Sequence, residues 1–153
     1  MIEKLNNKEL KIAKNIYSVF QSSYKVEAKL LNAKNFPPLK RSVENFLKSN
    51  SIFFGFYNDI ALTGIIELIK YENYTHIRSL VVDPSHFRKG IASKLMKHTF
   101  TLVDSNLIVV ETGVKNKPAI KLYEQFGFKE TKQWDTDHGV RKVKLEKNNL
   151  LPY

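Results

Sequence analysis

One short segment, residues 80–92, constrains the fold of this chain more than any other. An apolar run ends just before Pro84, and a turn containing Arg88, Lys89 and Gly90 leads directly into residues with helical spacing. Glycine lets the backbone approach a ligand closely, and the first N–H groups of a helix point at an anion bound there. The two basic side chains add positive charge at the same place. The segment therefore predicts a strand, a phosphate-binding turn and a helix in direct succession.

A second segment, residues 116–128, has the signals of another helix. Pro118 suits the first turn of a helix, because a proline there loses no internal hydrogen bond. Gly127 suits the residue after the last turn, where a left-handed backbone ends a helix. We expect a helix between Asn116 and Gly127 that carries Leu122 and Tyr123 in its middle.

Together the two segments resemble the GNAT-type N-acetyltransferases. The acetyl-CoA loop of that family follows [Q/R]-x-x-G-x-[G/A], and its late helix follows N-x-x-A-x-x-L-Y-x-x-x-G-F. Residues that match one pattern or the other are Gly90 and Ala92 in the loop, and Asn116, Ala119, Leu122, Tyr123, Gly127 and Phe128 in the helix. Phe87 departs from the loop pattern, since it stands where the family most often has Gln or Arg. Phosphate contacts in this family are mainly to main-chain amides, so the departure leaves the loop in place.

The resemblance implies a mixed α/β fold with a central, mostly antiparallel, splayed sheet flanked by helices on both faces. The chain of 153 residues is 42% hydrophobic, and it has no linker rich in Gly or Ser. We therefore expect a single domain over residues 1–153, and the resemblance implies a bacterial member of the family.

Periodicity and turn signals predict the individual elements. Strands are expected at residues 2–5, 51–57, 60–69, 75–82, 107–111, 128–134 and 139–145. Helices are expected from a cap at Asn6 or Asn7 to about residue 20, then at 26–31, 43–47 and 91–103, besides the helix after Asn116. The helix at 91–103 should face the core with Ile91, Ala92, Leu95, Met96, Leu102 and Val103. Pro37 and Pro38 predict a stiff, extended loop.

Composition excludes several kinds of function. The chain has no cysteine, which rules out disulfides, thiolate metal sites and an acetyl-cysteine intermediate. Its four histidines are dispersed, so no metal site is expected. No apolar run is long enough to cross a membrane and no signal peptide is apparent, so a cytoplasmic protein without membrane contact is expected.

The net charge of +10 raises the question of a polyanionic partner. Lysines are scattered along the whole chain, and no basic helix, aromatic platform or zinc-finger spacing accompanies them. We therefore expect no nucleic-acid partner, and part of the charge suits the phosphates of CoA. A monomer or a homodimer is expected.

The family resemblance assigns acetyl-CoA as the co-substrate. Main-chain groups of Leu80, Val81 and Val82 should hold the pantetheine arm, and an amide there should polarise the thioester carbonyl. The remaining residues expected to bind the cofactor are Phe87, Arg88, Lys89, Gly90, Ile91, Ala92, Ser93, Asn116, Ala119 and Tyr123. Tyr123 also occupies the place of the family's general acid, which serves the leaving thiolate; the alternative is that its ring only packs beside Leu122.

The general base is less well defined by the residues. Glu67 lies in an apolar strand, where an uncompensated carboxylate is costly, and this favours either a cleft position or a rim position paired with a lysine. His76 and Arg78 are the alternatives, because alternation places both on the strand face of Leu80.

Acceptor choice is expected to lie in the first third of the chain. In the family, the early helices and the following loop wall the acceptor pocket. Tyr24, Phe36 and Glu27 supply aromatic groups and a possible partner for an ammonium, which suits a small amine. The expected function is transfer of the acetyl group of acetyl-CoA to a primary amine by direct attack in a ternary complex. The alternative is a catalytically inactive CoA-binding or basic nucleic-acid-binding module.

Overall fold

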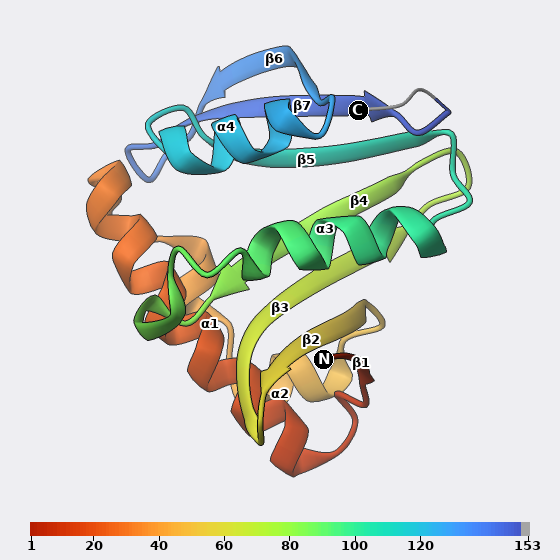
Figure 1. Ribbon diagram of the computed structural model, residues 1–153. Helices are drawn as coiled ribbons and strands as arrows, with labels where there is room; N and C mark the ends of the chain where they lie inside the picture. The colour runs from red at the N-terminus through yellow and green to blue at the C-terminus, as the bar shows by residue number, and fades with distance from the viewer. Residues whose placement is uncertain (151–153) are drawn as a thin grey trace.

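Seven strands form one sheet in a computed structural model that describes residues 1–150 (Figure 1). The strands are β1 (Ile2–Leu5), β2 (Ile52–Asn58), β3 (Ala61–Lys70), β4 (Thr75–Val82), β5 (Leu107–Gly113), β6 (Lys129–Asp135) and β7 (Arg141–Asn148). Their order across the sheet is β1-β2-β3-β4-β5-β7-β6. The last three residues of the expected domain 1–153 lie outside the described part.

The sheet splays apart between its two central strands. β4 and β5 are the parallel pair, and the other described pairs are antiparallel. Pairing between β4 and β5 is confined to Thr75 with Ile108, His76 with Val109 and Ile77 with Val110. Beyond these residues each strand continues beside its outer neighbour alone. The mixed α/β fold with a mostly antiparallel, splayed sheet is thus confirmed.

Helices cover both faces of the sheet. They are α1 (Leu10–Leu31), α2 (Val43–Lys48), α3 (Ile91–Leu102) and α4 (Lys117–Gln125), with short 3-10 turns η1 (Pro37–Lys40) and η2 (Pro84–His86). One buried cluster joins α3 and α4 to the sheet through residues such as Leu95 and Ile66. A second cluster joins α1 and α2 to the opposite face through residues such as Phe20 and Ile65. Because successive side chains of a strand point to opposite faces of the sheet, the strands contribute residues to two separate cores.

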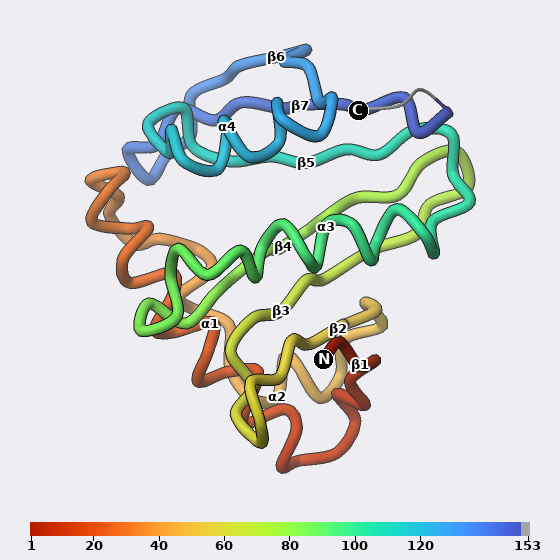
Figure 2. Tube along the Cα trace, in the orientation of Figure 1, coloured from red at the N-terminus to blue at the C-terminus, as the bar shows by residue number. Residues whose placement is uncertain are grey.

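The connection from β4 to α3 extends beyond the end of β4 and reaches α1. Figure 2 shows this trace passing beside the middle of α1, and η2 contacts that helix. Elements from the two faces of the sheet therefore meet at the open end of the splay.

Four local predictions are wrong, each for a physical reason. α1 is one helix of 22 residues, since no proline or glycine interrupts the two segments expected separately. Its cap is Glu9, because the Asn7 side chain instead donates hydrogen bonds to the carbonyls of Phe46 (2.7 Å) and Ser49 (3.0 Å).

The two prolines, Pro37 and Pro38, start the 3-10 turn η1 and do not form an extended loop. Leu102 is 46% exposed, since α3 ends there and its stripe buries Thr99 instead.

Candidate active site

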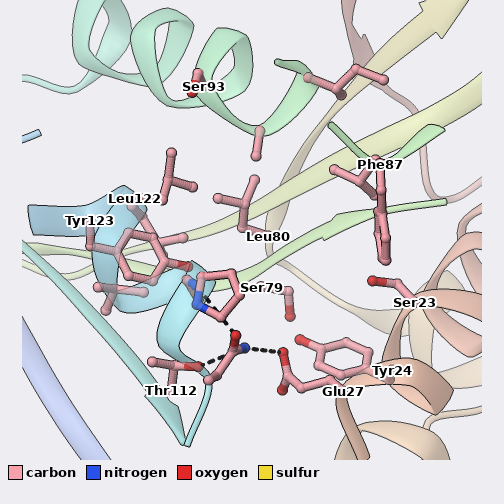
Figure 3. Close-up of a pocket in the computed structure, with 18 of the residues that line it drawn as sticks. Ser23, Tyr24, Glu27, Ser79, Leu80, Phe87, Ser93, Thr112, Leu122 and Tyr123 are labelled. Atoms are coloured by element: carbon pink, nitrogen blue, oxygen red, sulfur yellow. Dashed lines mark hydrogen bonds between the residues drawn. The ribbon is translucent and has the colours of Figure 1, made fainter. Parts of the chain in front are cut away.

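A cleft of about 400 Å³ occupies the splay between β4 and β5 (Figure 3). One wall is β4 from Ile77 to Val82, and the other is β5 from Val110 to Thr112. α1 closes one end with Tyr24 and Glu27, while the starts of α3 and α4 close the other faces. The cleft brings residues from both faces of the sheet together, because the strands no longer pair at this point.

The start of α3 has the geometry of a phosphate-binding turn. Gly90 has φ +75°, and Arg88 before it also has a positive φ of 64°. No side chain caps α3, and no acidic residue lies in its first turn, so its first N–H groups face the cleft without a protein carboxylate. A Cβ built on Gly90 meets no atom within 4 Å. The positive φ therefore favours glycine at this position, whereas no protein atom crowds the space beside its backbone.

Most of the residues predicted to bind the cofactor line this cleft. They are Leu80, Val82, Phe87, Arg88, Gly90, Ile91, Ala92, Ser93, Asn116, Ala119 and Tyr123. Two do not line it. The Val81 side chain is 2% exposed and packs in the opposite core with α1, because alternation turns it away from Leu80 and Val82. Lys89 is exposed and does not line the cleft, and its Nζ lies 3.3 Å from Nδ1 of His86.

Tyr123 lines the cleft from the middle of α4 (Figure 3). The side chain is 5% exposed, and its ring centroid lies 5.7 Å from that of Phe128. Burial raises the pKa of the Tyr123 hydroxyl, and the nearby carboxylate of Glu27 raises it further. The hydroxyl therefore keeps its proton at neutral pH and is available as a donor.

Glu27 and Asn116 join α1 to the start of α4. Asn116 Nδ2 donates a hydrogen bond of 3.0 Å to Oε1 of Glu27, and Asn116 Oδ1 accepts from the backbone N–H of Ala119. One amide thus caps α4 and holds a carboxylate 89 positions away. Burial raises the pKa of Glu27 to about 7, against smaller opposing effects of Lys142 and of the Asn116 hydrogen bond. Glu27 is therefore partly protonated at neutral pH.

A smaller cavity of about 110 Å³ adjoins the cleft at Tyr24 and Glu27. Phe36, Pro37 and Pro38 wall its outer side, and Arg78 and Glu111 lie between the two spaces. The residues predicted for the acceptor, Tyr24, Glu27 and Phe36, therefore lie around one space next to the cleft.

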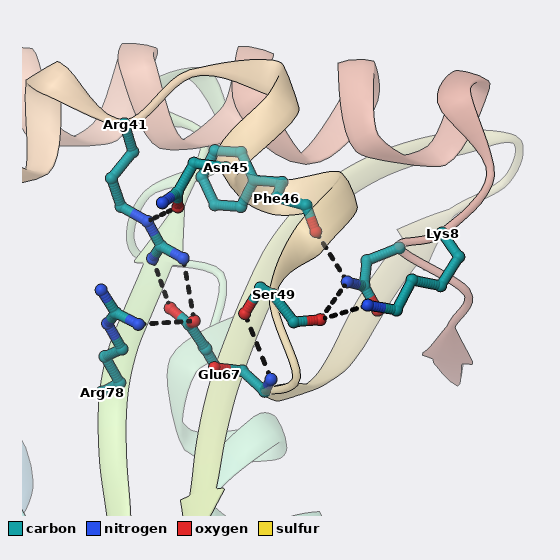
Figure 4. Close-up of polar contacts among 9 residues, drawn as sticks. Lys8, Arg41, Asn45, Phe46, Ser49, Glu67 and Arg78 are labelled. Atoms are coloured by element: carbon teal, nitrogen blue, oxygen red, sulfur yellow. Dashed lines mark hydrogen bonds and ion pairs between the residues drawn. The ribbon is translucent and has the colours of Figure 1, made fainter.

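Glu67, predicted as the base or as a rim residue paired with lysine, has neither position. It is fully buried on β3, the strand from which Figure 4 shows its side chain meeting Arg41 and Arg78, and it lines neither cavity. Its carboxylate accepts hydrogen bonds from Nη1 and Nη2 of Arg41, at 2.7 and 3.1 Å. Arg78 Nη1 lies 3.8 Å away from it. The interpretation of Glu67 as a base facing the cleft is therefore wrong, because the partner of this buried carboxylate is an arginine on another element.

His76 also lies outside the cleft. It shares the strand face of Leu80 as expected, but it sits where β4 and β5 still pair. Burial lowers the pKa of its imidazole. Arg78, two residues further, does line the cleft.

Sequence reasoning missed several residues that line the cleft. The polar ones among them are Ser23, Ser79, His86, Glu111 and Thr112. Glu111 follows an apolar run and precedes the helix at Asn116, a position that indicates a strand end facing the cleft. It lies 3.2 Å from the Lys142 ammonium. The serines and Thr112 have no such signal, because nothing local distinguishes them from surface residues.

Within residues 1–150, no three His, Asp or Glu side chains gather in a way that suits a metal ion. Over the same range, no helix is both long and apolar enough to span a membrane.

Comparisons with known proteins agree with this geometry. The model of the acetyltransferase (GNAT) family matches residues 13–128. UPF0157 protein YqkA of Bacillus subtilis is 35% identical over 141 residues, which is 92% of this chain and 41% of that protein. Spermidine N(1)-acetyltransferase of Vibrio cholerae is 34% identical over 76 residues, 45% of this chain and 43% of that protein. The chain thus spans less than half the length of these two curated relatives.

A solved structure has the same fold at low identity. It is the PaiA N-acetyltransferase of Thermoplasma acidophilum in complex with coenzyme A, with a TM-score of 0.77 and 20% identity. The match covers 97% of this chain and 99% of that one.

Proposed function

Because this chain belongs to the GNAT acetyltransferase family, we propose that it transfers the acetyl group of acetyl-CoA to the primary amine of a small acceptor. The amine attacks the thioester directly while both substrates are bound. The chain has no cysteine, so no thiol is available to carry the acetyl group.

The observation that carries this proposal is the cleft at the splay. An extended pantetheine arm fits between β4 and β5, where the facing main-chain groups of the two strands are not paired with one another. The uncapped start of α3 lies at one side of this cleft and suits the pyrophosphate. Tyr123 and the smaller cavity lie at the other side and suit the reacting end. The cleft and the adjoining cavity together therefore suit the two substrates.

Tyr123 serves the leaving sulfur in this proposal. Its raised pKa makes the hydroxyl a weaker acid than a free thiol, whose pKa is about 8.5. The hydroxyl therefore stabilises the developing thiolate as a hydrogen-bond donor and passes a proton to it only as the nitrogen releases one. A side chain in this role contributes about 10²- to 10⁴-fold to the rate.

The acceptor enters from the side of Tyr24, Glu27 and Phe36. The cavity of about 110 Å³ has Phe36, Pro37 and Pro38 in its wall and carries the carboxylates of Glu27 and Glu111 where it adjoins the cleft, which suits the arm and ammonium of a small amine. The relative from Vibrio cholerae is named a spermidine N(1)-acetyltransferase, which supports a small amine as the acceptor here.

Two measurements test the proposed function. Acetyl-CoA at 100 times its dissociation constant should stabilise the protein by about 2.7 kcal/mol in a thermal-shift assay. Release of the CoA thiol should then depend on the amine in a panel of polyamines, amino acids, arylalkylamines, aminoglycosides and peptide N-termini. Binding without turnover on any amine would favour an inactive CoA-binding module. No binding of acetyl-CoA, together with salt-sensitive binding of nucleic acid, would contradict the proposal.

A further inference from the structure

Glu27 is a carboxylate at the junction of two cavities, and it has no ion-pair partner in the described part of the chain. Among residues 1–150, no cationic side chain lies within 4.0 Å of it, and its hydrogen-bond donor is the neutral amide of Asn116. The side chain lines both the cleft and the adjoining cavity. Figure 3 shows it next to Tyr24 and across the cleft from Tyr123. A mostly buried carboxylate with one neutral donor retains lone pairs for a further donor.

We propose that Glu27 binds the ammonium of the acceptor and takes its first proton, so that it is the catalytic base of the reaction. This inference rests on the proposed function and names the residue that activates the amine. An ammonium with a pKa near 10 is almost fully protonated at neutral pH, and attack requires its lone pair. A carboxylate with a pKa of about 7 still holds a substantial charged fraction at that pH and is a far better acceptor than one near 4.5.

Asn116 gives this carboxylate a fixed orientation. Its Nδ2 donates to Oε1 of Glu27, which leaves Oε2 for the ammonium. The same amide caps α4, the helix that carries Tyr123. The start of α4 therefore positions both Glu27, which receives the first proton, and Tyr123, which donates to the sulfur.

The other acidic side chains near the cleft are less suited to this role. Glu67 is held by two hydrogen bonds from Arg41 and lies outside both cavities. Glu111 lines both cavities, but its Oε1 lies 3.2 Å from the Lys142 ammonium, so that oxygen already has a cationic partner.

The charged and titratable groups that face Glu27 come from every element around it. They are Tyr24 on α1, Arg78 on β4, Glu111 on β5, Tyr123 on α4, His138 in the β6–β7 turn and Lys142 on β7. Lys142 and Glu111 form an ion pair, and Arg78 lies 3.8 Å from Glu67. Both cations near Glu27 therefore already have a carboxylate partner.

The proton and electron pairs balance as follows. One proton moves from the ammonium to Glu27, and the freed lone pair forms the bond between nitrogen and the carbonyl carbon. The bond from carbon to sulfur breaks, and its electron pair stays on the sulfur. The Tyr123 hydroxyl then gives its proton to the sulfur and is reprotonated by the second proton of the nitrogen, which gives the amide and free CoA. Glu27 finally releases its proton to water.

The test is the pH dependence of turnover in Glu27→Gln. Glutamine keeps the shape and still accepts the hydrogen bond from Asn116, so the variant should fold and show the acetyl-CoA thermal shift of the natural protein. We expect kcat/KM for the amine at pH 7 to fall by about 10²- to 10⁴-fold, with much of the loss recovered towards pH 10, where the amine is neutral without help. Glu124→Gln is the matched control, because Glu124 is an exposed carboxylate on α4.

The outcomes are distinguishable. If the natural protein neither binds acetyl-CoA nor acetylates any amine of the panel, the proposed function fails. If it does both and Glu27→Gln retains the rate and pH profile of the natural protein, the assignment of Glu27 is overturned while the function stands. The same holds if Glu111→Gln, and not Glu27→Gln, loses rate at neutral pH and recovers it at high pH.

Asn116→Ser is a second test of the same assignment. Serine still caps a helix, but it removes the amide that donates to Glu27. Because that hydrogen bond lowers the pKa of Glu27, its loss should move the acidic limb of the kcat/KM profile to higher pH. An unmoved limb would contradict the coupling between the two residues.

Discussion

The guanidinium of Arg41 donates two hydrogen bonds, of 2.7 and 3.1 Å, to the buried carboxylate of Glu67 (Figure 4). The Glu67 side chain is 0% exposed and that of Arg41 10%. Arg41 also lies over the ring of Phe46, 4.4 Å from its centroid, and its Nε donates to Asn45. The pair therefore connects the segment between η1 and α2 to β3. This segment follows Pro37 and Pro38, which line the smaller cavity.

Removing one member of this pair should destabilise the fold. Arg41→Ala leaves a fully buried carboxylate with only the more distant Arg78, and we expect a loss of about 3–5 kcal/mol in the free energy of unfolding. The double variant Arg41→Met with Glu67→Leu should lose much less than the sum of the single losses, because it leaves no buried charge. Urea unfolding of the single and double variants measures this coupling. Additive losses would show that the pair does not act as a unit.

Tyr123→Phe tests the role of the hydroxyl without removing the ring. The contact with Phe128 is kept, so the variant should fold and bind acetyl-CoA almost unchanged. We expect kcat to fall by about 10²- to 10⁴-fold, because the group needed by the leaving sulfur has gone. Calorimetric titration and steady-state kinetics separate binding from turnover. Full turnover would return Tyr123 to a packing role.

Gly90→Val tests the phosphate turn. The backbone at this residue has φ +75°, which a β-branched residue adopts only with strain of about 1–2 kcal/mol. The added atoms would also project towards the expected position of the phosphates. We therefore expect weaker binding of acetyl-CoA by calorimetry. Gly90→Asn is the control, since asparagine tolerates this backbone conformation. Equal losses of acetyl-CoA affinity in both variants would show that glycine is needed for close approach of the cofactor to the backbone, and not for its conformation.

Phe87→Ala should change acetyl-CoA binding much less than Gly90→Val. Phe87 is 44% exposed and lies at the cleft near Ser23 of α1, and it supplies no group that hydrogen-bonds a phosphate (Figure 3). The same calorimetric titration checks this. A loss as large as that of Gly90→Val would mean that the ring itself contacts the cofactor.

The raised pKa of Glu27 predicts a cost in stability. Burial raises it from 4.5 to about 7, so the folded protein binds more protons than the unfolded chain between these pH values. The free energy of unfolding therefore falls as pH rises through this range, and it has lost the full contribution of Glu27 above pH 7. Glu27→Gln removes this cost, and we expect the variant to exceed the natural protein in stability at pH 8 by up to about 3 kcal/mol, but not at pH 4. Urea unfolding at both pH values, with Glu124→Gln as control, checks this; equal stability at pH 8 would contradict it.

Much of the fold could be predicted from local signals. The strand that ends before Pro84, the turn at Gly90 and the helix between Asn116 and Gly127 lie where the residues indicate, because proline, glycine and capping side chains act over a few neighbouring positions. Asn7 is the counterexample. Its side chain suits a helix cap, but two carbonyls near α2 bind it instead, and no local pattern reveals that competition.

The candidate site divides in the same way. The sequence alone determined the turn at Gly90 and the helix of Tyr123, since each is made within one segment of chain. Only the tertiary structure decided which distant side chains meet. Asn116 reaches Glu27 across 89 positions, and Arg41 reaches Glu67 across 26. Glu67 is held by Arg41, whereas burial without an ion-pair partner within residues 1–150 raises the pKa of Glu27. The partners that a carboxylate meets and its distance from water both depend on how the sheet splays and which helices pack over it.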